Sequence, residues 1–138
     1  MAGSAALAKL RAEPERVHAL RQNAEALHAL LECMCAQLGE DHADALCVLG
    51  DRVSPIKHLH LLWGADSRAD DTRRLQRMCD AVLAEAQFAL VVADYTPLQR
   101  RAPRASIRVV VSAGHQKRML EDVVAALASA VLAGGARA

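Results

Sequence analysis

The feature that most constrains this chain is a stripe of apolar residues near its N-terminus, spaced three and four positions apart. Side chains at this spacing share one face of a helix, because an α-helix has about 3.6 residues per turn. The pattern predicts one helix over Pro14–Leu38, with Pro14 in its first turn and Gly39 ending it. The stripe covers fewer than four heptads and contains alanine, which favours a helix lying on a sheet over a coiled coil. The stripe is made of Val17, Leu20, Ala24, Leu27, Leu31, Met34 and Leu38.

Short apolar and β-branched runs follow this helix and alternate with two more helical patterns. One helical pattern opens near Ser67 with acidic residues in its first turn, and its expected apolar face includes Leu83. The other follows Gly114 and closes at Gly134. A short helix is also expected over Ser4–Ala12. The expected strands are Ala45–Gly50, Lys57–Trp63, Phe88–Ala93 and Ser106–Ser112.

This order of elements predicts an α+β fold in which helices cover one face of a small, mostly antiparallel sheet. A chain of 138 residues has the length of a single domain. We expect residues 1–38 to form a helical lead-in that packs on the domain and residues 39–138 to form the α+β unit itself. Aromatic residues are only 2% of the chain, so the core must be aliphatic.

Composition argues against several classes of protein. The net charge is +1, and the densest basic stretch, Arg100, Arg101 and Arg104, lies in a proline-containing loop that is typical of a solvated turn. Nucleic-acid binding is the alternative, but the chain has only three of the aromatic residues on which single-stranded bases stack. No apolar run reaches the roughly 18 residues needed to span a bilayer, so no membrane span is expected.

Cysteine spacing gives no sign of a metal or redox site. The four cysteines form no C-x-x-C pair, and two of them are two positions apart in a helical stretch, where they point to nearly opposite faces. We expect reduced, partly buried thiols. The four residues are Cys33, Cys35, Cys47 and Cys79.

A few residues could carry chemistry. His58 and His60 share one face of their strand, which suits either a metal site or a solvated or interface surface. His18 and His28 lie off the apolar stripe and are expected at the surface. Lys57 is the least implausible lysine for a Schiff base, although we do not expect it to form one.

Arg108 lies between Ile107 and Val109 inside a strand of β-branched residues. An arginine there is either exposed, paired in a structural salt bridge, or placed to hold an anion, since its guanidinium can bind a carboxylate through two parallel hydrogen bonds. No nucleophile elbow and no glycine-rich phosphate loop occurs in the sequence. The sequence therefore supports Arg108 as a candidate substrate-binding residue and supports no catalytic residue.

The stretch Ser106–His115, Ser-Ile-Arg-Val-Val-Val-Ser-Ala-Gly-His, resembles a signature of the α-oxoamine synthases, which are fold-type-I, pyridoxal-phosphate enzymes. The earlier passage, Leu49-Gly50 and then Val53–Leu59, is also similar to a passage of that family, and the Pro97–Pro103 loop falls in the expected order. The resemblance covers roughly residues 2 to 134. Within the family it is most similar to the non-catalytic long-chain-base subunits of serine palmitoyltransferases, of the plant and algal type.

The resemblance implies the C-terminal domain of a fold-type-I transferase that belongs to a complex. That complex joins L-serine to palmitoyl-CoA at the cytosolic face of the endoplasmic reticulum membrane, as a heterodimer with a catalytic long-chain-base subunit that supplies the cofactor lysine. In catalytic members the arginine that matches Arg108 binds the substrate carboxylate. The family's cofactor domain is missing here, so the resemblance implies that pyridoxal phosphate belongs to the full complex, that none is bound by this chain alone, and that the chain alone is inactive.

Two alternatives stay open. One is a fragment of a homodimeric α-oxoamine synthase: a 5-aminolevulinate, 8-amino-7-oxononanoate or 2-amino-3-ketobutyrate synthase. The other is a stand-alone α+β binding or regulatory module. One departure from the family is local: Gln116 stands where the last helix is usually capped by serine or threonine, and Lys117 and Arg118 follow it, which is unfavourable for the helix dipole.

Overall fold

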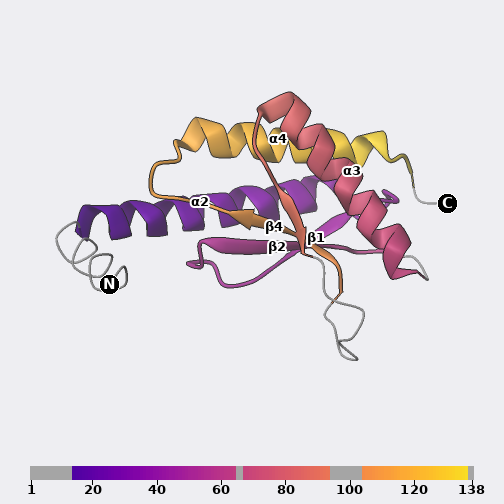
Figure 1. The fold of residues 1–138 in the computed structure, drawn as a ribbon, viewed down its shortest axis with the longest axis horizontal. Coiled ribbons are helices and arrows are strands. Elements are labelled where there is room, and N and C mark those ends of the chain that lie inside the picture. Colours follow the sequence, from indigo (N-terminus) through magenta and orange to yellow (C-terminus); the bar gives the residue numbers. More distant parts are fainter. Residues whose placement is uncertain (1–13, 65–66, 94–103, 137–138) are drawn as a thin grey trace, which may run out of the picture.

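The computed structural model describes residues 14–64, 67–93 and 104–136 (Figure 1). The fold is α+β, with helices packed on a four-stranded antiparallel sheet, as the sequence predicts. The helix expected over Ser4–Ala12 and the Pro97–Pro103 loop lie outside the described residues. The described elements are α2 (Pro14–Leu38), β1 (Leu46–Leu49), β2 (Ile56–Leu61), α3 (Arg68–Ala86), β3 (Val91–Ala93), β4 (Ser106–Val110) and α4 (Lys117–Ala133).

The strands lie in the order β1-β2-β4-β3, and each neighbouring pair is antiparallel. The two central strands are β2 and β4, in which His58 lies opposite Arg108 and Leu59 lies opposite Ile107. The short strand β1 forms one edge and β3 forms the other. Strands alternate their side chains between two faces, so this register decides which residues share a face.

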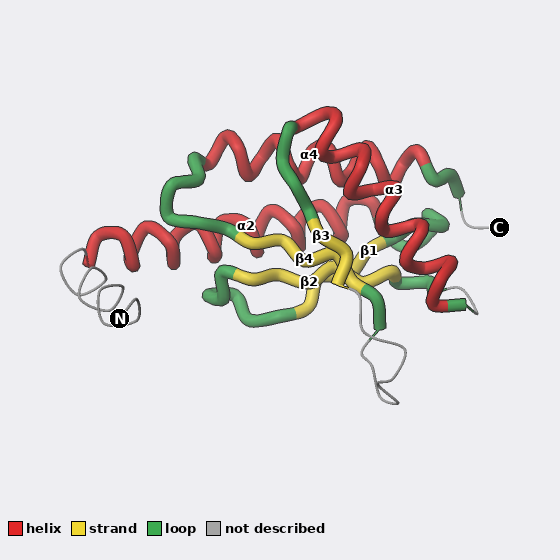
Figure 2. Tube along the Cα trace, viewed as in Figure 1, coloured by secondary structure: helices red, strands yellow, loops and turns green. Residues whose placement is uncertain are grey.

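The described helices all lie on one face of the sheet (Figure 2). On β2, Lys57, Leu59 and Leu61 are buried toward the helices, and on β4 Ile107 and Val109 are buried in the same way. α2 packs against β1, and α3 packs against β3 and β4. We call the other side of the sheet the open face. Its side chains include Leu49, Ile56, His58, His60, Val91, Arg108 and Val110.

The core is aliphatic, and the chain itself covers most of the α2 stripe. Leu27 and Leu31 have no exposed surface, because the sheet and α4 pack over them. Gly39 ends α2 with a positive φ of 73°, and its N–H donates to the carbonyl of Cys35. Only glycine adopts this conformation without strain, which explains why the helix stops at Gly39.

Two helical residues differ in exposure from what the sequence predicts. His28 is buried rather than exposed, because it follows Ala24 by four residues and precedes Leu31 by three, on the core side of α2. Its Nε2 lies 2.9 Å from a carboxylate oxygen of Glu32. Leu83 was expected in the apolar face of α3 but is 51% exposed, since it lies beside the buried row that ends at Val82.

Candidate functional site

Arg108 lies in the middle of the open face. Its neighbours along β4, Ile107 and Val109, point to the core, so alternation turns the guanidinium away from the helices. His58 of β2 and Val91 of β3 lie directly beside it on the two flanking strands. Among the residues that the structure describes, Arg108 makes no hydrogen bond or ion pair. A guanidinium without a carboxylate partner is available to an anion from outside the described residues.

The rest of the open face combines histidines with exposed aliphatic side chains. His58 Nδ1 lies 3.3 Å from the hydroxyl of Ser106, the β4 residue two positions before Arg108. The aliphatic side chains Leu49, Ile56, Val91 and Val110 are 41–59% exposed. No acidic residue occurs in β1, β2, β3 or β4. The open face is therefore suited to pack against an apolar surface that carries an anionic group.

His60 is expected to make the stability of the fold depend on pH in mild acid. Burial, followed by the charges of Arg104 and His58, lowers the pKa of His60 below its ordinary value of 6.5. The unfolded chain binds this proton near pH 6.5, whereas the folded chain binds it only at lower pH. The contribution of His60 to the free energy of unfolding should therefore be complete above about pH 6.5 and be lost as the pH falls through the folded pKa. For one proton, this loss is at most about 1.4 kcal/mol per pH unit.

Urea unfolding of the wild type and of His60→Gln, measured at several values between about pH 5 and 7.5, tests this. We expect the wild type to lose more stability than the variant as the pH falls. The remaining histidines are common to both chains, so the difference between the two curves isolates His60. Parallel curves would show that His60 titrates alike in the folded and unfolded chains.

The Ser112–His115 segment, which carries the end of the family signature, forms a turn between β4 and α4. The His115 N–H donates to the Ser112 carbonyl at 3.2 Å, and the Ser112 N–H donates to His115 Nδ1 at 2.9 Å. Asn23 of α2 donates through its side-chain amide to the carbonyls of Ser112 and His115, at 2.9 and 2.8 Å. The turn is thereby fixed to α2. Gln116 makes no side-chain cap at the start of α4, consistent with the weak cap expected from sequence.

Lys57 lies on the helix-covered face of β2 and is fully buried. Its Nζ donates to the backbone carbonyls of Asp51 at 2.8 Å and Arg52 at 2.9 Å. Burial lowers the pKa of Lys57, and the acidic groups of Asp51, Glu25 and Glu32 partly oppose that change. The sheet separates Lys57 from Arg108, so this lysine is not placed to form a Schiff base with a molecule bound on the open face.

No metal site emerges from the histidines and cysteines. Within residues 14–64, 67–93 and 104–136, no three His, Cys, Asp or Glu residues are grouped closely enough to hold an ion, His58 and His60 included. All four cysteines are free thiols. Burial raises the pKa of Cys79 to about 11, so that thiol is protonated at neutral pH and is a poor nucleophile.

The basic loop lies only partly within the described residues. Arg100 and Arg101 fall outside them, and Arg104 donates to the carbonyl of Leu61 at 2.6 Å. This hydrogen bond gives Arg104 a structural role beside the end of β2.

The main polar cluster that the sequence did not reveal is centred on Asp44. The carboxylate of Asp44 is buried and accepts hydrogen bonds from Arg74 Nε at 2.9 Å and Arg77 Nη2 at 2.5 Å. In the sequence Asp44 stands in a polar segment typical of a turn, and the two arginines are about 30 positions away. Nothing local to any of the three predicts that they meet.

Comparison of this chain with models of known protein families and with curated proteins found no match. Among the described helices, none is both long enough and apolar enough to cross a bilayer.

Proposed function

We propose that this chain is the C-terminal segment of a serine palmitoyltransferase subunit, within a complex that condenses L-serine with palmitoyl-CoA. It acts there as part of a heterodimer with the catalytic long-chain-base subunit, at the cytosolic face of the endoplasmic reticulum membrane. The chain contributes a docking face and the Arg108 guanidinium, while catalysis and the cofactor lysine belong to the partner.

The observation that carries this proposal is the position of Arg108. It lies at the centre of a sheet face that no described helix covers, without a partner among the described residues, and with apolar side chains around it. The two passages that resemble the α-oxoamine synthases, Val53–Leu59 and Ser106–His115, also contribute the two central strands, which pair directly with each other. A guanidinium in such a place suits the binding of a carboxylate such as that of L-serine.

The described residues do not fit the role of cofactor holder. A lysine that binds pyridoxal phosphate must face the site where substrate binds. Lys57 is on the other side of the sheet, and Lys117 opens α4. When bound, pyridoxal phosphate would supply the electron sink for the condensation, and the residues that hold it would come from another chain or segment.

A capture experiment tests the proposal. The tagged chain, co-expressed with a catalytic long-chain-base subunit, is expected to co-purify with it in a stoichiometric complex. Val110→Asp and Val91→Asp place a carboxylate on the open face at positions 50% and 59% exposed. Each should reduce capture about tenfold or more, because the new carboxylate must either be buried in the interface without a partner or pair with the Arg108 guanidinium, which is then no longer free to bind an anion.

Leu132→Asp is the matched control, since Leu132 is 53% exposed but lies on α4, away from the open face. It should leave capture unchanged. A chain that stays monomeric beside the catalytic subunit would contradict the proposal, as would equal loss of capture in all three variants. Self-association of the chain without that subunit would favour the homodimeric relatives instead.

A further inference from the structure

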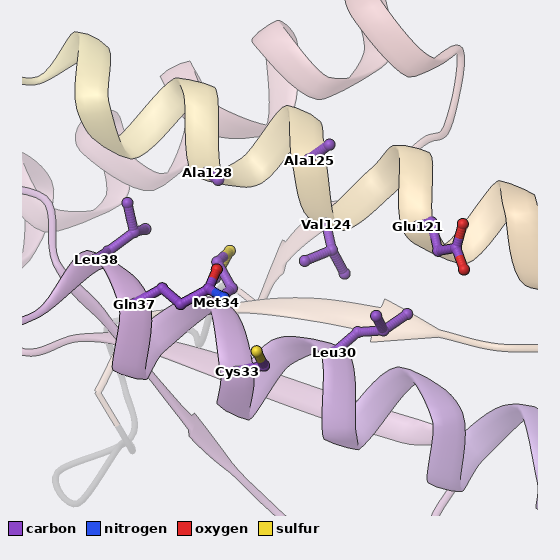
Figure 3. A pocket seen from close by; sticks show the side chains of 9 residues that line it. All are labelled: Leu30, Cys33, Met34, Gln37, Leu38, Glu121, Val124, Ala125 and Ala128. Carbon is purple, nitrogen blue, oxygen red and sulfur yellow. The ribbon is translucent and has the colours of Figure 1, made fainter.

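A groove between α2 and α4 combines apolar walls with one carboxylate. The two helices run side by side in the same direction (Figure 1). Leu30 and Met34 of α2 face Val124 and Ala128 of α4 across a groove of about 300 Å³, and Glu121 lies at the Leu30 end (Figure 3). The volume is at the lower limit of ordinary ligand pockets, and the lining is mainly apolar, as it is in such pockets.

Among the described residues that line the groove, the one charged side chain is acidic. No lysine or arginine lines it, and a neighbouring hollow between α3 and α4 is lined by Glu85 and Asp122. Within the described part of the chain, Glu121 makes no ion pair or hydrogen bond, although Lys117 and Arg118 lie one turn earlier on α4. The groove therefore offers an unpaired carboxylate at the end of an apolar surface.

The dimensions favour a single aliphatic chain. From Leu30 to Leu38 the α2 axis rises about 12 Å, the length of an extended alkyl chain of about eight to ten carbons. We propose that this groove binds the alkyl chain of a cationic amphiphile, an alkylammonium ion whose head group lies beside Glu121.

The two parts of such a ligand meet complementary surroundings. The alkyl chain removes the apolar walls from water, which is favourable in proportion to the area covered. The ammonium group stays partly hydrated beside Glu121, whose side chain is exposed, so it gains a charge partner without full desolvation. The groove is on the helical side of the sheet, so this ligand is independent of the function proposed for the open face.

Titration with n-hexyl-, n-octyl- and n-decylammonium chloride, below their micelle concentrations, tests the proposal. Chemical shifts of the Met34 and Val124 methyl groups give the dissociation constants. Affinity should rise about two- to fourfold per added methylene as the chain lengthens to about ten carbons. Decanol and decanoate have the same chain but no positive head, and should bind about three- to tenfold more weakly than decylammonium.

Three variants locate the site. Glu121→Gln should bring decylammonium down to the affinity of decanol, and Ala128→Phe should abolish binding by filling the groove. Glu15→Gln removes an exposed carboxylate at the start of α2 and should change nothing. Equal binding of the three ten-carbon ligands, or no saturable shift at Met34 and Val124, would overturn the proposal. If Ala128→Phe fails to fold, Glu121→Gln and the methyl shifts still decide it.

Discussion

Replacement of Asp44 by alanine is expected to lower the free energy of unfolding by about 2–4 kcal/mol. The carboxylate is 5% exposed and holds two guanidinium groups, so its removal leaves both cations without their buried partner. Removing one member of a buried ion pair costs about 3–5 kcal/mol. We expect a smaller loss here because the side chains of Arg74 and Arg77 are 26% and 43% exposed to water. Urea unfolding measures the loss.

The matched control is Arg73→Ala, which breaks the exposed pair of Arg73 with Asp70 on the same helix. Exposed ion pairs contribute little, so this variant should change stability by less than about 1 kcal/mol. A second route to the Asp44 cluster is Gly134→Ala, because a Cβ there would collide with the Asp44 carboxylate, whereas one at Gly114 would meet nothing closer than 3.9 Å. If Asp44→Ala and Arg73→Ala lower the free energy of unfolding by the same amount, the buried Asp44 cluster does not stabilise the fold more than an exposed ion pair does.

The Asp44 cluster ties together segments that are distant in the sequence. Arg74 also donates to the carbonyl of Ala43, and to the carbonyl of Trp63 at 3.1 Å. Arg77 donates to the carbonyl of Ala130 at 3.1 Å. These contacts join the segment before β1 to α3 and to the end of α4. A pattern confined to one helix or strand cannot predict such a cluster, because its partners are chosen by the fold.

The elements themselves could be predicted because their patterns are local. The apolar spacing located α2 at Pro14–Leu38, and the alternation in β2 placed Leu59 and Leu61 on the buried face with His58 and His60 opposite. Strand ends were less accurate. The expected strand Phe88–Ala93 is reduced to Val91–Ala93, since the end of a strand depends on where its partner in the sheet stops.

Only part of the candidate site could be predicted from the sequence. Alternation along β4 predicts that Arg108 points away from Ile107 and Val109, but it does not predict which residue of the neighbouring strand lies beside it. The pairing of His58 with Arg108 is set by the register between β2 and β4. That register is fixed by the burial of both strands on one face, which the whole sheet decides.

Burial of Lys57, in contrast, was already encoded in the sequence. Lys57 has the same parity along β2 as Leu59 and Leu61, so a strand that buries the leucines must also bury the lysine. His28 is a similar case on α2, because its spacing from Ala24 and Leu31 puts it on the core side. The expectation for His28 followed residue type rather than position, although polar side chains do occupy core positions where hydrogen-bonding partners are present.

Replacement of Lys57 by alanine is expected to lower the free energy of unfolding by about 3–5 kcal/mol. The aliphatic part of the side chain fills space between the sheet and the helices, and truncation leaves a cavity there, as in Met→Ala substitutions in protein cores. The substitution also removes the ammonium group that holds the Asp51 and Arg52 carbonyls in the loop between β1 and β2. Equilibrium unfolding in urea measures the sum of the two effects.

Lys57→Met separates those two effects, because methionine keeps most of the volume and loses only the charge and its hydrogen bonds. The Asp51 and Arg52 side chains are exposed, so water can replace the ammonium at their carbonyls, and we expect Lys57→Met to cost only about 1–2 kcal/mol. The lowered pKa of Lys57 adds a second signature. Wild-type stability should rise as the pH passes the folded pKa toward 10.5, because the buried amine then becomes neutral, and Lys57→Met should lack that rise. A methionine variant as unstable as the alanine variant would mean that the hydrogen bonds, rather than the packing of the aliphatic part, hold this lysine in the core.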